Sequence, residues 1–326
     1  MLFPKFLSKS STIGITAPSC GVGDDIPSFE KSLETLKKEY KVIETESVRN
    51  KGRVSTNSIK RAKELDELVT NKDVSMILCA SGGDFLFDML KYVNWDNIKK
   101  NPKWIVGYSD PTSLLYYITT TLDIATIYGV NAGSFDQTHL HKSLQNTLEI
   151  WKGNLLEQHS FSMYQKERVE GSDGYNLTEK VFWKTPNKKV SIKGRLIGGC
   201  LDSLKDIIGT PYDNTKQFIE KYKDDGIIWY FDIFARTAEE TYLTLYQMQE
   251  AGWLKYCKGI IVGRVCFPKC FYEDFSYEKA LTELFPDLPI IMDADIGHVP
   301  PKMTLINGAI TEIKCENGKG VIKQQI

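Results

Sequence analysis

Short apolar runs alternate with amphipathic stretches over the first 130 residues. The runs are short and stop at glycine, serine or proline, so they predict buried strands. Between them, apolar residues recur every three or four positions, as Phe29, Leu33 and Leu36 do, which predicts helices with one buried face. The expected strands are 13–16, 41–44, 75–80, 104–107 and 125–129, and the expected helices are 27–40, 58–69, 85–93 and 114–122. This alternation predicts a parallel sheet covered on both faces.

The second half of the chain resumes the alternation after a polar interruption. Residues 157–191 carry few periodic apolar positions. We expect a helix over 237–252, because Thr237 and Glu240 have the spacing of a capping box, and a terminal hairpin turning at Asn317 and Gly318. Further strands are expected at 190–197, 226–231, 259–265 and 289–292. The pattern predicts an N-terminal domain over 1–155, a linker or flap over 156–190 and a C-terminal domain over 191–326.

Residues 104–112 combine a strand, a sharp turn and the start of a helix. The run Trp104-Ile105-Val106-Gly107 ends at a glycine, Ser109 follows two residues later, and Pro111 opens an apolar helical segment. This layout is typical of a nucleophile elbow, in which the turn lifts the serine hydroxyl clear of its own backbone. The first amides of the following helix would then point at the group that the serine attacks. The segment therefore indicates a hydrolase.

Active groups in a parallel sheet lie beyond the carboxyl ends of its strands. Three polar or glycine-rich segments follow expected strands in the first domain: Pro18-Ser19, Gly82-Gly83 and the Ser109 turn. We expect these segments to converge in space, although they are far apart in the sequence.

A serine nucleophile needs a base, and the chain has only four histidines, at 139, 141, 159 and 298. His139 and His141 lie in a polar segment, and His159 lies in the expected linker. His298 follows a buried strand in Gly297-His298-Val299-Pro300-Pro301, where the glycine and the two prolines restrict the backbone. A single histidine is more often structural than catalytic, but a rigid loop at a strand end favours function.

The carboxylate that would orient the histidine is expected at another strand end. Asp232 ends the apolar run 227–231, and a carboxylate leaving a buried strand is costly unless it is paired. The alternative is that Asp232 caps the following turn. Glu239 and Glu240 are rival acids.

Composition restricts the partners of the chain. Lys and Arg number 41 and Asp and Glu number 42, so no overall field attracts nucleic acid or an anionic membrane. No apolar stretch reaches the roughly 20 residues that span a bilayer, and the first residues lack a signal-peptide core. The seven cysteines form no C-x-x-C pair, and Cys266 and Cys270 have no histidine nearby to complete a zinc site. We expect reduced thiols, a cytoplasmic location, and neither a metal nor a cofactor.

A nucleotide-binding site after the first strand is a weaker alternative. Gly21 and Gly23 could approach a phosphate, but Asp24 and Asp25 in the same turn would repel it. No lysine of the phosphate-binding type follows.

The chain resembles the LD-carboxypeptidases, serine peptidases that trim peptidoglycan peptides, and their relatives that provide microcin C immunity. The resemblance covers nearly the whole length. It rests on the segments GITAPS (14–19), SGGD (81–84), VGYSDPT (106–112), GRLIGG (194–199), IWYFD (228–232) and GHVPP (297–301). The Ser109 and His298 motifs in this order and spacing are specific together, whereas each is weak alone.

The resemblance implies roles for particular residues. Ser109 would be the nucleophile and His298 the general base, and the backbone amides of Gly83 and Asp110 would form the oxyanion hole. The family normally has a glutamate where this chain has Asp232, which is one methylene shorter and would have to lie closer to the imidazole. This chain also has Ser81 where many relatives have arginine, and Cys200 where an asparagine often follows Gly199. Substrate contacts are expected from Gly82 and Gly199 and, from their place beside the motifs, from Arg264 and Lys302.

The resemblance also implies a fold and a substrate. It implies an α/β protein with an N-terminal Rossmann- or flavodoxin-like parallel sheet, a C-terminal mixed α/β domain of the swivelling, barrel-like kind, and a homodimer. The expected reaction is hydrolysis of the amide between an L-centre and a terminal D-amino acid, so that a muropeptide tetrapeptide loses D-alanine. One alternative is an immunity-type amidase acting on aminoacyl-nucleotide analogues, with aromatic residues of the linker stacking on the base: Tyr164, Tyr175, Phe182 and Trp183. Another is a cell-wall fragment binding protein whose triad is weakened by Asp232.

Overall fold

The computed structural model describes residues 1–169, 171–187 and 189–326, which form two compact units. The first unit comprises Met1–Asn154 and Gly171–Gly174, and the second comprises Leu155–Glu170 and Tyr175–Ile326. The segment expected as a linker thus belongs mostly to the second unit. Its residues 171–174 belong to the first.

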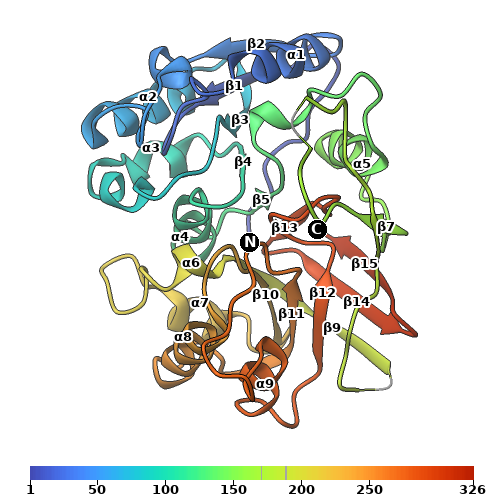
Figure 1. The fold of residues 1–326 in the computed structure, drawn as a ribbon. Coiled ribbons are helices and arrows are strands. Elements are labelled where there is room, and N and C mark those ends of the chain that lie inside the picture. Colours follow the sequence, from blue (N-terminus) through green and yellow to red (C-terminus); the bar gives the residue numbers. More distant parts are fainter. Residues whose placement is uncertain (170, 188) are drawn as a thin grey trace. The chain divides into compact units, whose positions relative to one another are not determined.

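The first unit is built on a parallel sheet (Figure 1). Its strands are β1 (Thr12–Thr16), β2 (Lys41–Glu44), β3 (Val74–Cys79), β4 (Trp104–Gly107) and β5 (Thr126–Tyr128). They lie in the order β2-β1-β3-β4-β5, and each neighbouring pair is parallel. This order is the flavodoxin-like one. From β1 the chain first adds β2 on one side of the sheet and then adds β3, β4 and β5 on the other side. Because helices cover both faces, residues such as Ile15 and Leu78 are fully buried.

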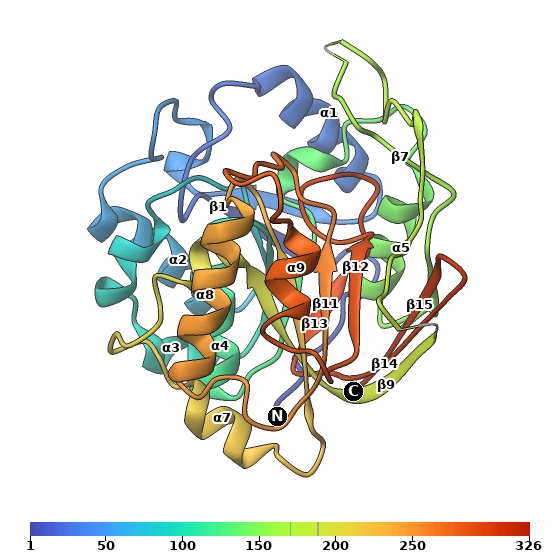
Figure 2. The same ribbon diagram turned by 60° about the horizontal axis from the view of Figure 1, so that its bottom comes forward.

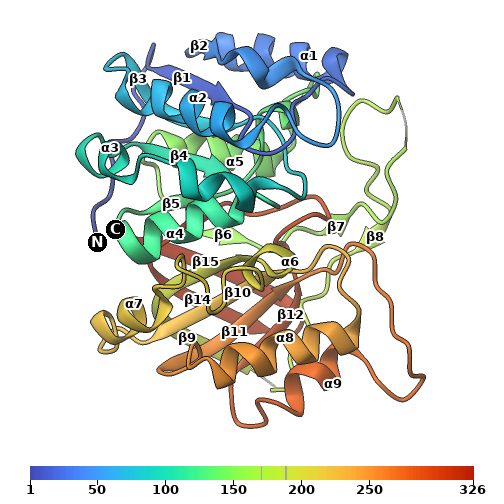
Figure 3. The same ribbon diagram turned by 90° about the vertical axis from the view of Figure 1, so that its left-hand side faces the viewer.

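Helices flank this sheet on both sides (Figure 3). α2 (Ser58–Thr70), α3 (Trp95–Lys100) and α4 (Thr112–Leu122) lie on one face, and α1 (Ile26–Lys37) and α5 (Lys142–Trp151) lie on the other. Right-handed crossovers between parallel strands require this distribution. Side chains of Asp25 and Asn57 cap α1 and α2. Two short 3₁₀ helices, η1 (Glu46–Arg49) and η3 (Ala132–Ser134), lie in connections.

The segment expected as a helix over 85–93 is a 3₁₀ helix, η2 (Leu86–Tyr92), rather than an α-helix. Its buried residues Leu86 and Met89 are three positions apart, which suits three residues per turn. The Leu86 N–H donates to the side chain of Asp110 at 2.8 Å, so the start of the segment is fixed by the turn that carries Ser109.

The second unit contains a mixed sheet. β9 (Lys189–Cys200), β10 (Ile227–Asp232), β11 (Cys257–Gly263) and β12 (Ile290–Ala294) are parallel, in the order β12-β11-β10-β9. From β9 the sheet continues antiparallel through β14 (Ile310–Glu316) and β15 (Lys319–Gln325) to β6 (Gln158–His159). The remaining strands of the unit are β7 (Met163–Tyr164), β8 (Glu179–Lys180) and β13 (Leu305–Asn307).

The helices of the second unit are α6 (Leu201–Leu204), α7 (Thr215–Lys221), α8 (Ala238–Glu250) and α9 (Tyr277–Thr282). Figure 2 shows α8 and α9 side by side. The capping box of Thr237 and Glu240 is present at the start of α8, as predicted. The predicted hairpin is also confirmed, because Asn317 and Gly318 adopt positive φ values of 52° and 78° between β14 and β15.

Among the described residues, no helix combines the length and apolar character needed to cross a membrane.

Candidate active site

Ser109 lies on a strained turn between β4 and α4. Its φ is +70°, a conformation that costs a non-glycine residue about 1–3 kcal/mol and marks positions fixed by their surroundings. The Ser109 carbonyl accepts the Thr112 N–H at 2.9 Å, and its own N–H donates to the Tyr128 hydroxyl at 3.3 Å. Gly107 permits the turn, since an added Cβ would lie 2.9 Å from Cβ of Pro111. The strand, turn and helix predicted around Ser109 are therefore confirmed.

Two glycines after β3 lie directly against this turn. A Cβ added to Gly82 would be 3.0 Å from the Ser109 Oγ, so the Gly82 backbone borders the hydroxyl. Gly83 has φ +148°, and a Cβ there would be 2.3 Å from the Ser19 Oγ. The predicted convergence of the loops after β1, β3 and β4 is confirmed by these contacts.

The Asp110 side chain joins the three loops. It is buried, and it accepts hydrogen bonds from the Ser19 hydroxyl and from the Leu86 N–H, the latter at 2.8 Å. Burial raises the pKa of this carboxyl above its ordinary value. Within the described part of the chain, the backbone N–H groups of Gly83 and Asp110 donate to no other residue. The loop after β3 and the Ser109 turn thus each offer one backbone amide donor.

The His298 ring and the Asp232 carboxylate lie against each other in the second unit. The His298 Nδ1 lies 2.8 Å from the Asp232 Oδ2, and Asp232 Oδ1 also accepts the His298 backbone N–H at 3.3 Å. Asp232 is fully buried at the end of β10, whereas the His298 side chain is 10% exposed. Because Nδ1 faces the carboxylate, Nε2 faces away from it and can exchange a proton with a substrate or a hydroxyl. The aspartate reaches the imidazole although it is shorter than a glutamate.

Gly297 makes this close approach possible. It has φ +90°, and a Cβ at this position would be 2.0 Å from Asp232 Oδ1. Any other residue would therefore clash with the carboxylate in addition to straining the backbone. The close contact between His298 and Asp232 therefore requires the glycine of the GHVPP segment.

Cys200 and Asp202 surround the same strand end. Cys200 is the register neighbour of Asp232 across β9 and β10, and burial, followed by the negative charge of Asp232, raises the pKa of its thiol well above the ordinary value. Asp202 accepts the backbone N–H groups of Phe234 at 3.0 Å and Ala235 at 3.1 Å. These bonds fix the loop that follows Asp232.

Comparison with known proteins agrees with this arrangement. The model of the LD-carboxypeptidase N-terminal domain matches residues 13–129, and the model of the LD-carboxypeptidase C-terminal domain matches residues 193–313. The chain belongs to the LD-carboxypeptidase family. The two matched regions contain Ser109 in the first and Asp232 and His298 in the second.

Individual relatives span the whole chain. This LD-carboxypeptidase family member is 25% identical to the microcin C7 self-immunity protein MccF of Escherichia coli, over 98% of this chain and 92% of that protein. It is also 25% identical to a probable murein peptide carboxypeptidase of Bacillus subtilis, over 98% and 94% of the two chains. The fold matches that of muramoyltetrapeptide carboxypeptidase from Oxalobacter formigenes, with TM-score 0.75, 21% identity, and 97% and 99% of the two chains covered. A structure of MccF in complex with aspartyl sulfamoyl adenosine matches with TM-score 0.82, 21% identity, and 100% and 99% covered.

Arg264, one of the expected substrate contacts, is engaged inside this family member. Its guanidinium lies 2.7 Å from the buried Asp295 carboxylate and also donates to the carbonyls of Asp293, at 3.1 Å, and Pro301, at 3.3 Å. The ring of Tyr164 lies 4.7 Å from its Cζ. These contacts join both sides of the loop that carries His298.

Lys302 and Gly199, two further expected substrate contacts, lie near Asp232. Lys302 is 8% exposed. Burial raises the pKa of the Cys266 thiol, the charge of Asp232 raises it further, and the charge of Lys302 lowers it. Gly199 pairs with Phe231, one residue before Asp232, in the parallel register of β9 and β10.

The rival histidines and acids have other partners. The His141 side chain caps α5, exposed His139 lies in the segment before it, and His159 pairs with Glu157 at 3.1 Å. Glu240 belongs to the capping box, and Glu239 accepts the backbone N–H groups of Phe271 and Tyr272. Of the three candidate acids Asp232, Glu239 and Glu240, Asp232 is therefore the one that lies against the His298 ring.

Aromatic residues beside His298 were not predicted from the sequence. The Phe234 ring lies 4.5 Å from the imidazole, centroid to centroid, and 5.1 Å from the ring of Phe267, which is 59% exposed. The linker residue Trp183, expected to stack on a base, is instead fully buried, with its Nε1 donating to Asp295 at 3.0 Å. Phe234 and Phe267 lie in loops without apolar periodicity. The position of Phe234, two residues after the end of β10, is the one sequence signal that could have indicated a role at the site.

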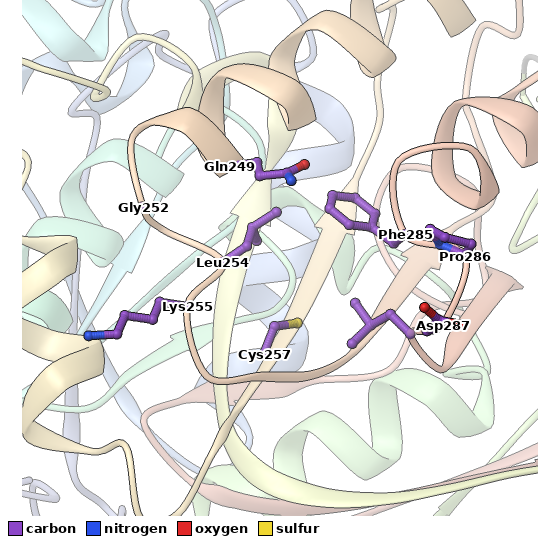
Figure 4. Close-up of a pocket in the computed structure, with 9 residues that line it drawn as sticks. Gln249, Gly252, Leu254, Lys255, Cys257, Phe285, Pro286 and Asp287 are labelled. Atoms are coloured by element: carbon purple, nitrogen blue, oxygen red, sulfur yellow. The ribbon is translucent and has the colours of Figure 1, made fainter.

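A pocket of about 640 Å³ lies elsewhere in the second unit, between the end of α8 and the loop before β12 (Figure 4). Its lining includes Leu254, Cys257 and Phe285. Cys257 is at the amino end of β11, whereas Asp232 is at the carboxyl end of the parallel neighbour β10. The pocket is thus at the opposite edge of the sheet from Asp232, and none of the predicted site residues lines it.

Proposed function

We propose that this LD-carboxypeptidase family member is a serine-type carboxypeptidase that removes a terminal D-amino acid, D-alanine above all, from muropeptides. Two structural observations carry the proposal. Ser109 lies at φ +70° beside two glycines, and His298 lies against the buried Asp232. The substrate class is supported by the murein peptide carboxypeptidase relative, which matches over 98% of the chain.

In the proposed reaction, Ser109 and His298 act on the same scissile amide. The Ser109 Oγ attacks the carbonyl carbon while the His298 Nε2 takes its proton, and Asp232 stabilises the imidazolium through Nδ1. The backbone N–H groups of Gly83 and Asp110 stabilise the oxyanion, an interaction worth about 3–4 kcal/mol per donor in related chemistry. The imidazolium then protonates the leaving amine. Water, activated by the same histidine, hydrolyses the acyl-enzyme and regenerates Ser109.

Substrate contacts are proposed from residues near these groups. The Gly82 backbone borders the Ser109 hydroxyl, and Gly199 is adjacent in register to the strand end of Asp232. We assign the substrate carboxylate to Lys302 rather than to Arg264. The charge of Arg264 is already neutralised by Asp295, so its proposed role is to position the loop of His298.

Organisation and location are proposed from coarser observations. We propose that the two units are the two domains of the protein, with the boundary near residue 155, and that the protein is a cytoplasmic homodimer. The structure describes all seven cysteines and pairs none of them in a disulfide, which supports a reducing compartment. Light scattering after size-exclusion chromatography would determine the oligomeric state.

The decisive experiment is incubation of the purified protein with a muropeptide tetrapeptide, with released D-alanine measured by chiral chromatography. The proposal expects release by the wild type and at most background release by Ser109→Ala. An L-alanine-terminated tetrapeptide is the matched control and should be cleaved at least about tenfold more slowly. No release by the wild type, or equal release by Ser109→Ala, would overturn the proposal.

A second candidate function is that of an immunity-type amidase acting on aminoacyl-nucleotide analogues. It is favoured by the aromatic pair Phe234 and Phe267 beside His298, because exposed rings can stack on a base, and by the match to MccF. Aspartyl sulfamoyl adenosine tests it directly. Hydrolysis that exceeds D-alanine release and falls in Phe267→Ala would favour the amidase. The third hypothesis is a cell-wall fragment binding protein with a weakened catalytic triad. The distance of 2.8 Å between His298 Nδ1 and Asp232 Oδ2 argues against it.

A further inference from the structure

Three side chains of different chemistry meet at the carboxyl ends of β9 and β10. Cys200, Asp232 and His298 each offer one donor atom, and these atoms all lie within 4.8 Å of one another. Cys200 and Asp232 are direct register neighbours on parallel strands, and His298 comes from the loop after β12. The proposed hydrolase uses the aspartate and the histidine, whereas it gives the cysteine no role.

This donor set is the kind that binds zinc. Thiolate, imidazole and carboxylate are its protein ligands, with bonds of about 2.0–2.3 Å, so that ligand atoms around a tetrahedral ion lie roughly 3.3–3.7 Å apart. Donors within 4.8 Å therefore need to close by only about 1 Å. Three protein ligands leave a fourth position for water.

The surroundings of the three donors favour a specific site. Cys200 is 2% exposed and Asp232 is fully buried, so their strand backbones fix two donors in a place with little water. The His298 side chain is 10% exposed and gives an ion access from solvent. A sulfur donor favours zinc over magnesium or calcium, which prefer oxygen ligands.

We propose that Cys200, Asp232 and His298 form a Zn²⁺ site whose occupation switches off the hydrolase. On binding, the Cys200 thiol releases its proton to solvent and the sulfur bonds to the metal. The carboxylate and the imidazole donate lone pairs to the ion. Metal binding therefore replaces the contact between His298 and Asp232 and removes the general base from the reaction. The inhibitory part of the proposal rests on the proposed hydrolase function, whereas the binding part does not.

Binding is tested with Co²⁺, which takes zinc sites and has a visible and near-ultraviolet spectrum. The chelator-treated full-length protein is titrated with Co²⁺, and one equivalent should produce a thiolate-to-cobalt charge-transfer band that Zn²⁺ then abolishes. Cys200→Ser should lose this band and weaken zinc binding by more than about 100-fold. Cys266→Ser is the matched control, because Cys266 is half-buried near Asp232 but outside the donor set, and it should keep the band.

Inhibition is measured separately, as the ratio of D-alanine release with and without Zn²⁺ within each variant. The wild type should lose at least about 90% of its activity at saturating zinc and recover it with chelator, whereas Cys200→Ser should lose much less. An absent charge-transfer band, or the same band in Cys200→Ser, would overturn the site. A confirmed band with undiminished or increased hydrolysis would overturn the inhibitory role. If the protein releases no D-alanine under any condition, the hydrolase proposal fails while the cobalt titration still decides the site.

Discussion

Ser109 and His298 are held in place by different means. Ser109 depends on the backbone: a positive φ, glycines at 107, 82 and 83, and the buried Asp110 that joins three loops. His298 depends on a side chain, because Asp232 binds both its ring and its backbone N–H. We therefore expect the position of Ser109 to tolerate side-chain substitutions but not substitutions of the glycines. The position of His298 should be lost when the single carboxylate of Asp232 is altered. The predictions below separate these two kinds of support.

The largest effect is expected at Ser109. Ser109→Ala removes the proposed nucleophile and should lower kcat by about 10⁴-fold or more, without loss of thermal stability, because the backbone hydrogen bonds of the turn remain. D-alanine release and the melting temperature measure the two effects. Ser113→Ala, a buried serine in the first turn of the same helix, is the control and should keep its activity. A large loss of folding in Ser109→Ala would contradict the backbone account.

The next effect is expected at Asp232. Asp232→Asn keeps the shape but removes the charge that holds the imidazole, and it should lower kcat by about 10²–10⁴-fold. KM should change much less, because the carboxylate orients the base rather than the substrate. Asp225→Asn is the control: it breaks the ion pair with Arg195 in the same unit, 2.6 Å in length, and should affect stability rather than kcat. Equal loss of kcat in both variants would refute the role assigned to Asp232.

A smaller, mixed effect is expected at Gly297. Gly297→Ala places a Cβ 2.0 Å from Asp232 Oδ1, so it should lower kcat by about 10–100-fold and reduce the free energy of unfolding by about 2–4 kcal/mol. Gly209→Ala is a matched control, because Gly209 also has a positive φ, +74°, but nothing within 4 Å of an added Cβ. It should cost only about 1 kcal/mol. Similar losses in the two variants would mean that backbone strain, not the clash, is responsible.

The smallest effect is expected at Asp110 and depends on pH. Because burial raises the pKa of this carboxyl in the folded state, its contribution to stability is present at low pH and is lost as pH rises through the folded-state pKa. Asp110→Asn keeps an oxygen that can accept from Ser19 and Leu86 but cannot ionise. The melting temperature of the variant relative to wild type should therefore increase between about pH 4 and pH 7. If the difference in melting temperature between the variant and the wild type did not change with pH, ionisation of Asp110 would not affect stability.

The sequence predicted the periodic parts of the molecule well. The five strands of the first unit, its helices α1, α2 and α4, the capping box at Thr237 and the hairpin at Gly318 follow from local patterns, and the structure has them. The elbow was predictable for the same reason: strand, turn and helix are contiguous in the chain. The helices α3 and α5 were not predicted. A helix was expected over 85–93, and the structure has the 3₁₀ helix η2 there. Its contact with Asp110 joins residues 24 positions apart, which the local pattern could not indicate.

Contacts between distant segments could not be predicted in this way. The motif positions suggested Arg264 as a substrate contact, but its pairing with Asp295 joins residues 31 positions apart. Trp183 was expected to be free to stack, yet its partner Asp295 lies 112 residues further along. The Phe234–His298 contact and the approach of Cys200 to Asp232 depend on strand register. The periodicity of apolar residues predicts which residues are buried, but it does not predict which buried polar groups pair with each other.

The central claim is that Ser109 is a nucleophile activated by His298 and Asp232. The most direct test is incubation with a fluorophosphonate, followed by intact-mass and peptide mass spectrometry. We predict one adduct per chain, located on Ser109, in the wild type, and labelling at least about 10²-fold slower in His298→Gln and Asp232→Asn. Labelling at another residue, or labelling of Ser109 at the same rate in all three proteins, would contradict the claim.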